Sequence, residues 1–143
     1  RGRMGLLNRR REREIAGGYR DRLAIRTPDL ETRVTSLSGG NQQKVVFARG
    51  LATECRVLVV DEPTRGVDVG AKREIHELIA RLASDGTVIL LISSDLPELL
   101  ALAHRLVVLR GGRVVAEIDR TEATEESVVA AMTGVEHSPA RSG

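Results

Sequence analysis

The chain has 143 residues and a formal net charge of +2, with 41% hydrophobic and 29% charged residues. This is the composition of a globular domain, not the polar, highly charged composition of a disordered chain. One Tyr, one Phe and no Trp argue against a single-strand nucleic-acid surface built on stacked aromatic rings, and the single Cys excludes an internal disulfide and a cysteine-rich zinc site.

Positive charge is concentrated near the N-terminus, where residues 1–33 carry ten arginines and five acidic residues. Such a stretch could contact phosphates or a membrane surface. Apolar residues at helical spacing predict a helix over residues 8–24, which the Thr27-Pro28 pair should end. Glutamates alternate with the arginines, so we favour a solvated, salt-bridged helix over a basic tail.

The middle of the chain alternates between helical and strand patterns. A turn over residues 36–40 precedes a predicted helix over 41–53, with Ser38 placed as its N-cap. The apolar run 57–60, which ends at Asp61, predicts a strand buried on both faces, as in a parallel sheet. Ile75, Leu78, Ile79 and Leu82 place an amphipathic helix at 70–84. A second apolar strand is predicted at 88–92.

The last third predicts a short helix at 96–103, a hairpin of strands 106–109 and 114–118 around Gly111-Gly112, and a helix at 124–132 that Gly134 stops. Residues 135–143 are expected to be a disordered tail. The order of elements predicts an α/β fold: a mostly parallel sheet flanked by helices, with a C-terminal β-hairpin. Ligands of such sheets bind at the carboxyl ends of the strands.

Two acidic residues stand at one of these strand ends. Asp61 could hold Mg²⁺ near phosphates, and Glu62 could polarise an attacking water. Because many strands end in acids, this pair by itself is better explained as two solvated carboxylates.

The octapeptide LSGGNQQK, residues 37–44, is a sharper signal. Its two glycines permit close backbone approach, and they stand at a helix start, where N–H groups and the helix dipole favour an anion. The Ser38 hydroxyl adds a donor. The simpler alternative is an ordinary capped helix after a glycine turn.

These motifs resemble those of the ATP-binding cassette family of transporters. Residues 37–44 resemble its signature motif, VLVVDE (57–62) its Walker B strand and GVD (66–68) its D-loop. The runs NQQK and DEPTRGVDVGAK resemble the monosaccharide importer branch, the ribose, galactose and xylose type. The resemblance covers residues 1–134 and matches the C-terminal part of the second of two tandem cassettes.

The resemblance implies a partial P-loop NTPase fold, with residues 1–35 in the helical subdomain and 36–134 in the ATPase core. It implies ATP and Mg²⁺ as cofactors. Asp61 would bind the magnesium ion, and Glu62 would orient or activate the hydrolytic water. The residues implied in contacting ATP or crossing to the opposite cassette are Ser38, Gly39, Gly40, Asn41 and Asp68.

The sequence departs from the family's pattern at three points. It contains no G-x-x-x-x-G-K-S/T phosphate loop and no identifiable glutamine loop. Ser94 occupies the catalytic place of the switch histidine, and Asn41 stands where glutamine is most common. We therefore expect the isolated chain to be marginally stable or to recruit a partner, to bind ATP and Mg²⁺ poorly and to be inactive as an ATPase.

The implied partners are transmembrane permease subunits and a second cassette with the missing phosphate-loop half, at the cytoplasmic face of the inner membrane and without nucleic acid. Three alternatives stay open. The chain could be a non-catalytic signature-donating or regulatory module, a DNA-repair or chromosome-maintenance cassette, or a gene remnant without function.

The remaining candidate residues carry weaker signals. His76, His104 and His137 lack metal-ligand spacing, and we expect His76 to be structural. Cys55 is expected to be a buried or neutral thiol rather than a nucleophile, because no histidine is placed to activate it.

Overall fold

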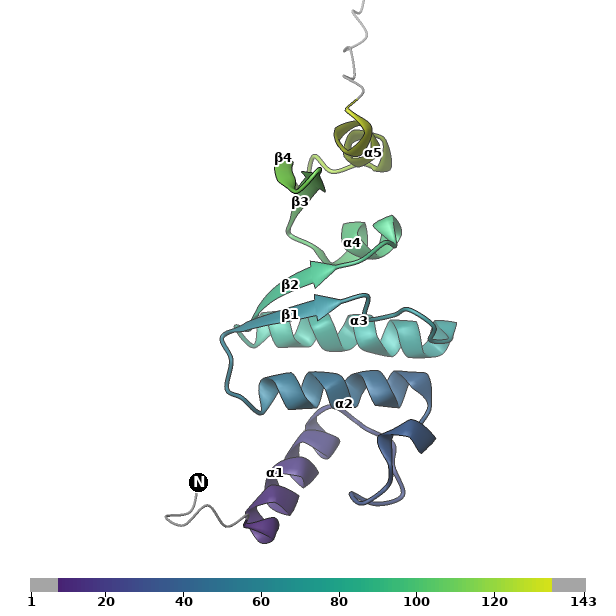
Figure 1. Cartoon of the computed structure of the whole chain (residues 1–143), viewed down its shortest axis with the longest axis vertical. Helices are drawn as coiled ribbons and strands as arrows, with labels where there is room; N and C mark the ends of the chain where they lie inside the picture. The colour runs from purple at the N-terminus through teal and green to yellow at the C-terminus, as the bar shows by residue number, and fades with distance from the viewer. Residues whose placement is uncertain (1–7, 135–143) are drawn as a thin grey trace, which may run out of the picture. The chain divides into compact units, whose positions relative to one another are not determined.

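The computed structural model describes residues 8–134, so the predicted tail at 135–143 and His137 lie outside the described residues. Two compact units meet in sequence between Leu90 and Leu91. The first contains α1, α2, β1, α3 and the start of β2, and the second contains α4, β3, β4 and α5 (Figure 1).

Helix α1 (Arg9–Arg22) confirms the predicted N-terminal helix, and the side chain of Asn8 accepts a capping hydrogen bond from the N–H of Arg11. The helix ends earlier than expected. Ala24 takes a left-handed φ of 50°, and the N–H of Ile25 donates to the carbonyl of Arg20 at 2.8 Å. This Schellman arrangement closes the helix before Pro28, so the prediction that the Thr27-Pro28 pair ends it is wrong.

Helix α2 (Gly39–Leu51) follows a short 3₁₀ turn, η1 (Val34–Ser36), and starts and ends two residues before the predicted bounds. Ser38 is its N-cap residue, as expected, but its side chain makes no capping hydrogen bond. One stripe of the helix is buried, and it contains a lysine among otherwise small or apolar residues: Gly40, Lys44, Phe47 and Leu51.

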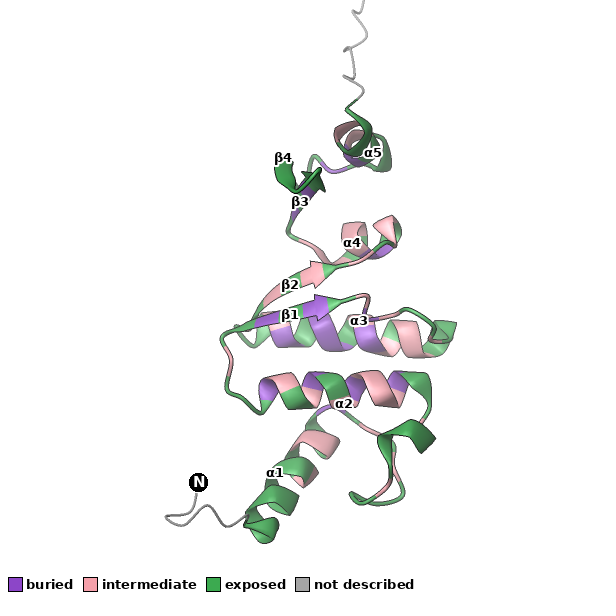
Figure 2. Ribbon diagram, viewed as in Figure 1, coloured by how far each residue is buried: buried purple, intermediate pink, exposed green. Residues whose placement is uncertain are grey.

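Strand β1 (Val57–Asp61) pairs with β2 (Val88–Ile92), and both arrows run in the same direction in Figure 1. The prediction that strand 57–61 is buried on both faces is wrong. Leu58 and Val60 are buried, whereas Val59 is 60% exposed. Alternate residues of β2 are likewise exposed (Figure 2). Side chains alternate between faces, so within the described residues one apolar face of these strands is uncovered.

Helix α3 (Val69–Ser84) confirms the predicted amphipathic helix, and its four buried residues are those expected from the spacing: Ile75, Leu78, Ile79 and Leu82. The side chain of Asp68 caps its start, and Gly86, with a φ of 90°, follows its end.

The second unit has a core of its own. Helix α4 (Leu96–Leu102) leads into the antiparallel hairpin of β3 (Arg105–Arg110) and β4 (Arg113–Asp119), followed by α5 (Glu125–Thr133). Both turn glycines have positive φ, 58° at Gly111 and 75° at Gly112, which suits a two-residue hairpin turn. The predicted hairpin and the stop at Gly134 are confirmed. The buried centre of this core is Leu106, Val108, Ala123 and Val128.

Glycines allow two close approaches within the first unit. A Cβ built at Gly40 would lie 2.7 Å from the Cβ of Ala71 on α3, and one built at Gly50 would lie 2.7 Å from Cδ1 of Leu58 on β1. Both separations are below van der Waals contact. Helix α2 therefore reaches its close packing against α3 because Gly40 carries no side chain, whereas the atom facing Gly50 is the end of a flexible leucine side chain.

Within residues 8–134, no helix is both long enough and apolar enough to cross a membrane.

We predict that Gly40→Ala lowers the free energy of unfolding by about 1–2 kcal/mol, because the added methyl group forces α2 and α3 apart. Urea denaturation of the full chain measures the change. Gly39→Ala is the matched control: its new Cβ would meet Cγ1 of Val67 at 3.5 Å, an ordinary contact. Equal losses for the two variants would contradict the packing argument, as would a failure of Ala71→Gly to restore part of the loss caused by G40A.

Candidate functional site

The start of α2 presents hydrogen-bond donors to solvent. Ser38 and Gly39 are exposed, whereas Gly40 is buried against α3. The first N–H groups of a helix have no intrahelical acceptor, and together with the helix dipole they favour an anion. Ser38 and Gly39 are therefore open to a ligand, while the backbone approach that Gly40 permits is to Ala71 of the same chain.

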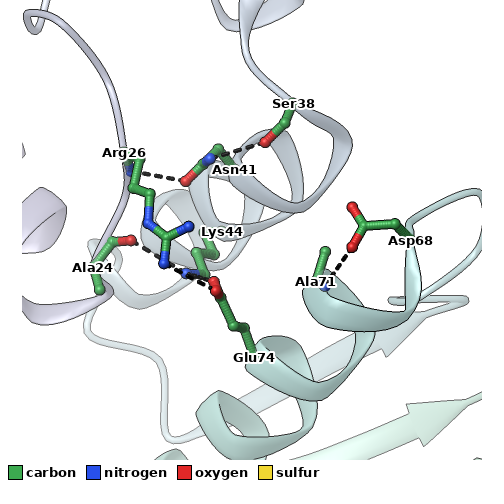
Figure 3. Close-up of polar contacts among 8 residues, drawn as sticks. All are labelled: Ala24, Arg26, Ser38, Asn41, Lys44, Asp68, Ala71 and Glu74. Atoms are coloured by element: carbon green, nitrogen blue, oxygen red, sulfur yellow. Dashed lines mark hydrogen bonds and ion pairs between the residues drawn. The ribbon is translucent and has the colours of Figure 1, made fainter.

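Asn41 ties the first turn of α2 to the loop that follows α1 (Figure 3). Its Oδ1 accepts a hydrogen bond from the backbone N–H of Arg26 at 2.7 Å, and its Nδ2 donates to Oγ of Ser38 at 2.9 Å. Both ends of the amide are thus used within the chain. The sequence placed Asn41 among the ATP-binding residues and gave no sign of this link, because Arg26 is 15 residues away.

Lys44 lies one turn further along the same face of α2, and its side chain is buried. Its Nζ donates to Oε2 of Glu74 on α3 at 2.8 Å and to the carbonyl oxygen of Ala24 at 3.1 Å. Nη2 of Arg26 donates to the other carboxylate oxygen of Glu74 at 3.0 Å (Figure 3). Two cations therefore share one carboxylate, and the loop at residues 24–26 is fixed to both helices.

The carboxylate of Glu74 is the group whose titration this cluster changes. The hydrogen bond from Lys44 and its positive charge hold the pKa of Glu74 below its usual value. Partial burial of the carboxylate opposes this shift, and Arg26 adds a smaller lowering effect. Sequence reasoning missed Lys44 and Glu74. The available signal was a lysine on the stripe Gly40–Lys44–Phe47–Leu51, since a buried ammonium group requires a partner.

The two acids at the end of β1 have different environments. Asp61 is the last residue of the strand and is exposed, and by alternation it shares a face with Val59. Glu62 is half-buried and has a φ of 47°, a left-handed conformation that costs a non-glycine residue about 1–2 kcal/mol. Strained backbone of this kind clusters at functional sites, which agrees with the sequence-based interest in this pair.

Asp68, the D-loop residue of the resemblance, is exposed at the N-terminus of α3. Its Oδ1 accepts a hydrogen bond from the N–H of Ala71 at 2.9 Å (Figure 3). The structure thus gives Asp68 a local capping role, which the sequence analysis did not assign.

Ser94 belongs to the second unit, where it is exposed in the loop between β2 and α4. In the same loop, the hydroxyl of Ser93 accepts from the N–H of Asp95 at 3.0 Å, and Asp95 in turn caps α4.

The donor chemistry fits a nucleotide with magnesium only in part. Within residues 8–134, no group of three His, Cys, Asp or Glu side chains could enclose a metal ion. Mg²⁺ commonly takes one or two protein carboxylates and completes its shell with phosphate oxygens and water. Asp61 fits as such a ligand, and the exposed donors at Ser38 and Gly39 fit a phosphate.

Comparisons with known proteins agree with these motifs. Residues 10–65 match the ABC transporter family. A ribose import ATP-binding protein of Streptomyces avermitilis is 55% identical over 132 residues, which are 92% of this chain and 26% of that protein. A xylose import ATP-binding protein of Moorella thermoacetica is 51% identical over 90% of this chain and 26% of that protein. The chain spans about a quarter of the length of these curated relatives.

The fold also matches solved structures. A dimeric bacterial ABC transporter cassette superposes with a TM-score of 0.68 and 25% sequence identity, over 81% of this chain and 50% of that one. The predicted α/β fold, a partial ATP-binding cassette, is confirmed.

The lowered pKa of Glu74 predicts a pH-dependent contribution to stability. A carboxyl whose folded pKa is depressed stabilises the fold above its unfolded pKa of about 4.3, and this contribution is lost as pH falls through the folded pKa. Glu74→Gln should therefore destabilise the chain clearly at pH 7 and less at pH 3, as measured by urea denaturation. Glu77→Gln, which removes an exposed ion pair on the same helix, is the control. A cost of E74Q that did not shrink in acid would contradict the assignment.

The N-terminal cap of α3 gives a further prediction. Asp68→Ala should lower the free energy of unfolding by about 0.5–2 kcal/mol, because the N–H of Ala71 loses its acceptor. Asp68→Ser keeps a capping oxygen and should retain most of the stability. Thermal unfolding followed by circular dichroism compares the two, and similar melting temperatures for D68A and wild type would show that the cap contributes nothing.

Proposed function

We propose that this chain, whose residues 10–65 match the ABC transporter family, forms part of the ATP-binding subunit of a sugar importer. The relatives named above are ribose and xylose import ATP-binding proteins. In this proposal, ATP binding and hydrolysis drive carbohydrate transport across the membrane, and the subunit is peripheral, at the cytoplasmic face.

The observation that carries the proposal is the exposed Ser38 at the start of α2, within a motif of the family's signature type. Its hydroxyl and the neighbouring N–H groups would bind the γ-phosphate of ATP held by an opposite cassette. Donors placed in advance where negative charge develops are an efficient way to stabilise a transition state. Asp68 would contribute to the contact between the cassettes.

The other candidate residues would serve the nucleotide held on this chain's own side. Asp61 would coordinate Mg²⁺ together with phosphate oxygens, and Glu62 would orient the attacking water. Ser94 would donate a hydrogen bond in the place of the switch histidine. Helix α1, which buries none of its residues, would face the permease subunits.

A second candidate is a module that donates the signature to another cassette without hydrolysing ATP itself. It rests on the same exposed Ser38 at the start of α2, whose hydroxyl would contact a nucleotide held by another cassette. Nothing comparable favours a DNA-binding cassette. Two arginines of α1 are paired with acids, Arg10 with Glu14 at 3.1 Å and Arg13 with Glu31 at 2.8 Å, and this pairing reduces their attraction for phosphates.

The test is complementation of a disabled cassette. The partner is an ABC cassette that keeps its phosphate loop but has arginine in place of its own signature serine. Adding the full chain with ATP and Mg²⁺ should raise turnover by about tenfold or more, because losing one such donor typically costs about 10²–10³ in rate.

Ser38→Arg should abolish the stimulation, since a bulky cation would occupy the place of the hydroxyl. Ser36→Arg is the matched control: Ser36 is also exposed, two residues earlier, and its hydroxyl donates to the carbonyl of Arg33. No stimulation by the wild-type chain, or an equal loss in S36R and S38R, would refute signature donation. Stimulation by a chain that shows no turnover alone would favour the donating module over a self-sufficient ATPase.

A further inference from the structure

The direction of the hydrogen bonds around Asn41 determines what the Ser38 hydroxyl can do. A backbone N–H only donates, so the atom of Asn41 that faces the N–H of Arg26 must be the oxygen. This assigns the amide orientation from the chemistry of its neighbour, and Nδ2 is left facing Oγ of Ser38 at 2.9 Å.

An amide nitrogen has no lone pair to offer, so Ser38 must be the acceptor in this contact. A hydroxyl has one hydrogen to donate and two acceptor positions. Within residues 8–134, the Ser38 side chain makes this hydrogen bond and no other. Its hydrogen therefore remains available on the exposed side, where only an external acceptor can take it.

Two further contacts keep this arrangement in place. Arg26 is held through its guanidinium group, which binds Glu74, and the carbonyl of Ala24 is held by Lys44. Lys44 itself pairs with Glu74 while only 5% exposed, so its position is fixed by packing. The loop at residues 24–26 thus presents its N–H to Asn41 from a rigid support on two helices.

We propose that Asn41 is a positioning residue rather than a ligand: it occupies one acceptor position of Ser38 and so leaves the hydroxyl as a donor directed at a phosphate oxygen. This inference rests on the proposed function, and it names how the signature serine is prepared. The expected consequence is that Asn41 affects the catalytic rate only through Ser38.

Asn41→Asp tests the idea with a side chain of nearly the same size. A carboxylate still accepts from the N–H of Arg26, and a negative charge in the first turn of a helix is favourable, so the variant should fold. The carboxylate cannot donate to Ser38, however, and instead accepts the hydroxyl's hydrogen. Ser38 would then be turned away from the phosphate.

The kinetic experiment is a double-mutant cycle of N41D and S38A in the full chain, with turnover measured against the signature-disabled cassette. With Ser38 present, N41D should lower kcat by about tenfold or more. In the S38A background it should lower kcat by less than about twofold, since residues that act through one group are not additive. The added negative charge repels the nucleotide and can raise KM in both backgrounds. Loss of the Ser38 donor lowers kcat, so comparing kcat with KM separates the two effects.

A second readout does not depend on ATP. In the free full chain, the side-chain amide signals of Asn41 should exchange slowly with solvent by NMR, and exchange should quicken in S38A. Fast exchange in the wild type would overturn the inference whatever the turnover. The same loss of kcat from N41D with and without Ser38 would also overturn it. If wild type gives no stimulation at all, the proposed function fails, a result distinct from either of these.

Discussion

Helices α2 and α3 approach so closely at Gly40 that a methyl group there would lie 2.7 Å from the Cβ of Ala71. The Lys44–Glu74 ion pair of the candidate site, which joins the same two helices, depends on this approach. The approach brings Glu74 within hydrogen-bond distance of Lys44, and Lys44 in turn fixes the loop that holds Asn41. A glycine that the sequence associates with phosphate access therefore also sets the spacing of two helices.

The buried ammonium group of Lys44 fixes the position of groups next to the candidate site. Taking an ammonium group out of water is costly unless a carboxylate and further acceptors replace the solvent, and here Glu74 and the carbonyl of Ala24 do so. The same carboxylate binds Arg26, so one acid serves two cations from different segments. The result is a fixed loop rather than a large gain in stability, because the outer part of the cluster is exposed to solvent.

The first unit presents two kinds of group with complementary chemistry. Hydrogen-bond donors stand at the start of α2, and carboxylates stand at the end of β1. Donors suit phosphate oxygens, and carboxylates suit the magnesium ion that accompanies a nucleotide. The left-handed backbone at Glu62 is disfavoured for a non-glycine residue, so the surrounding structure holds the strand end in this conformation. Together these features support the proposed binding of ATP with magnesium more strongly than either does alone.

The sequence by itself determined what local patterns encode. The apolar stripe of α3, the glycine turn of the hairpin and the motif at residues 37–44 could all be identified from spacing, because each depends on hydrogen bonds and side chains close together in the chain. Only the tertiary structure decided the end of α1 at a left-handed Ala24, the open face of β1, and the partners of Lys44 and Asn41. The hydrogen bonds from Asn41 to Arg26 and from Lys44 to Ala24 and Glu74 join residues 15 to 30 positions apart, and no local pattern specifies which distant group will be the partner.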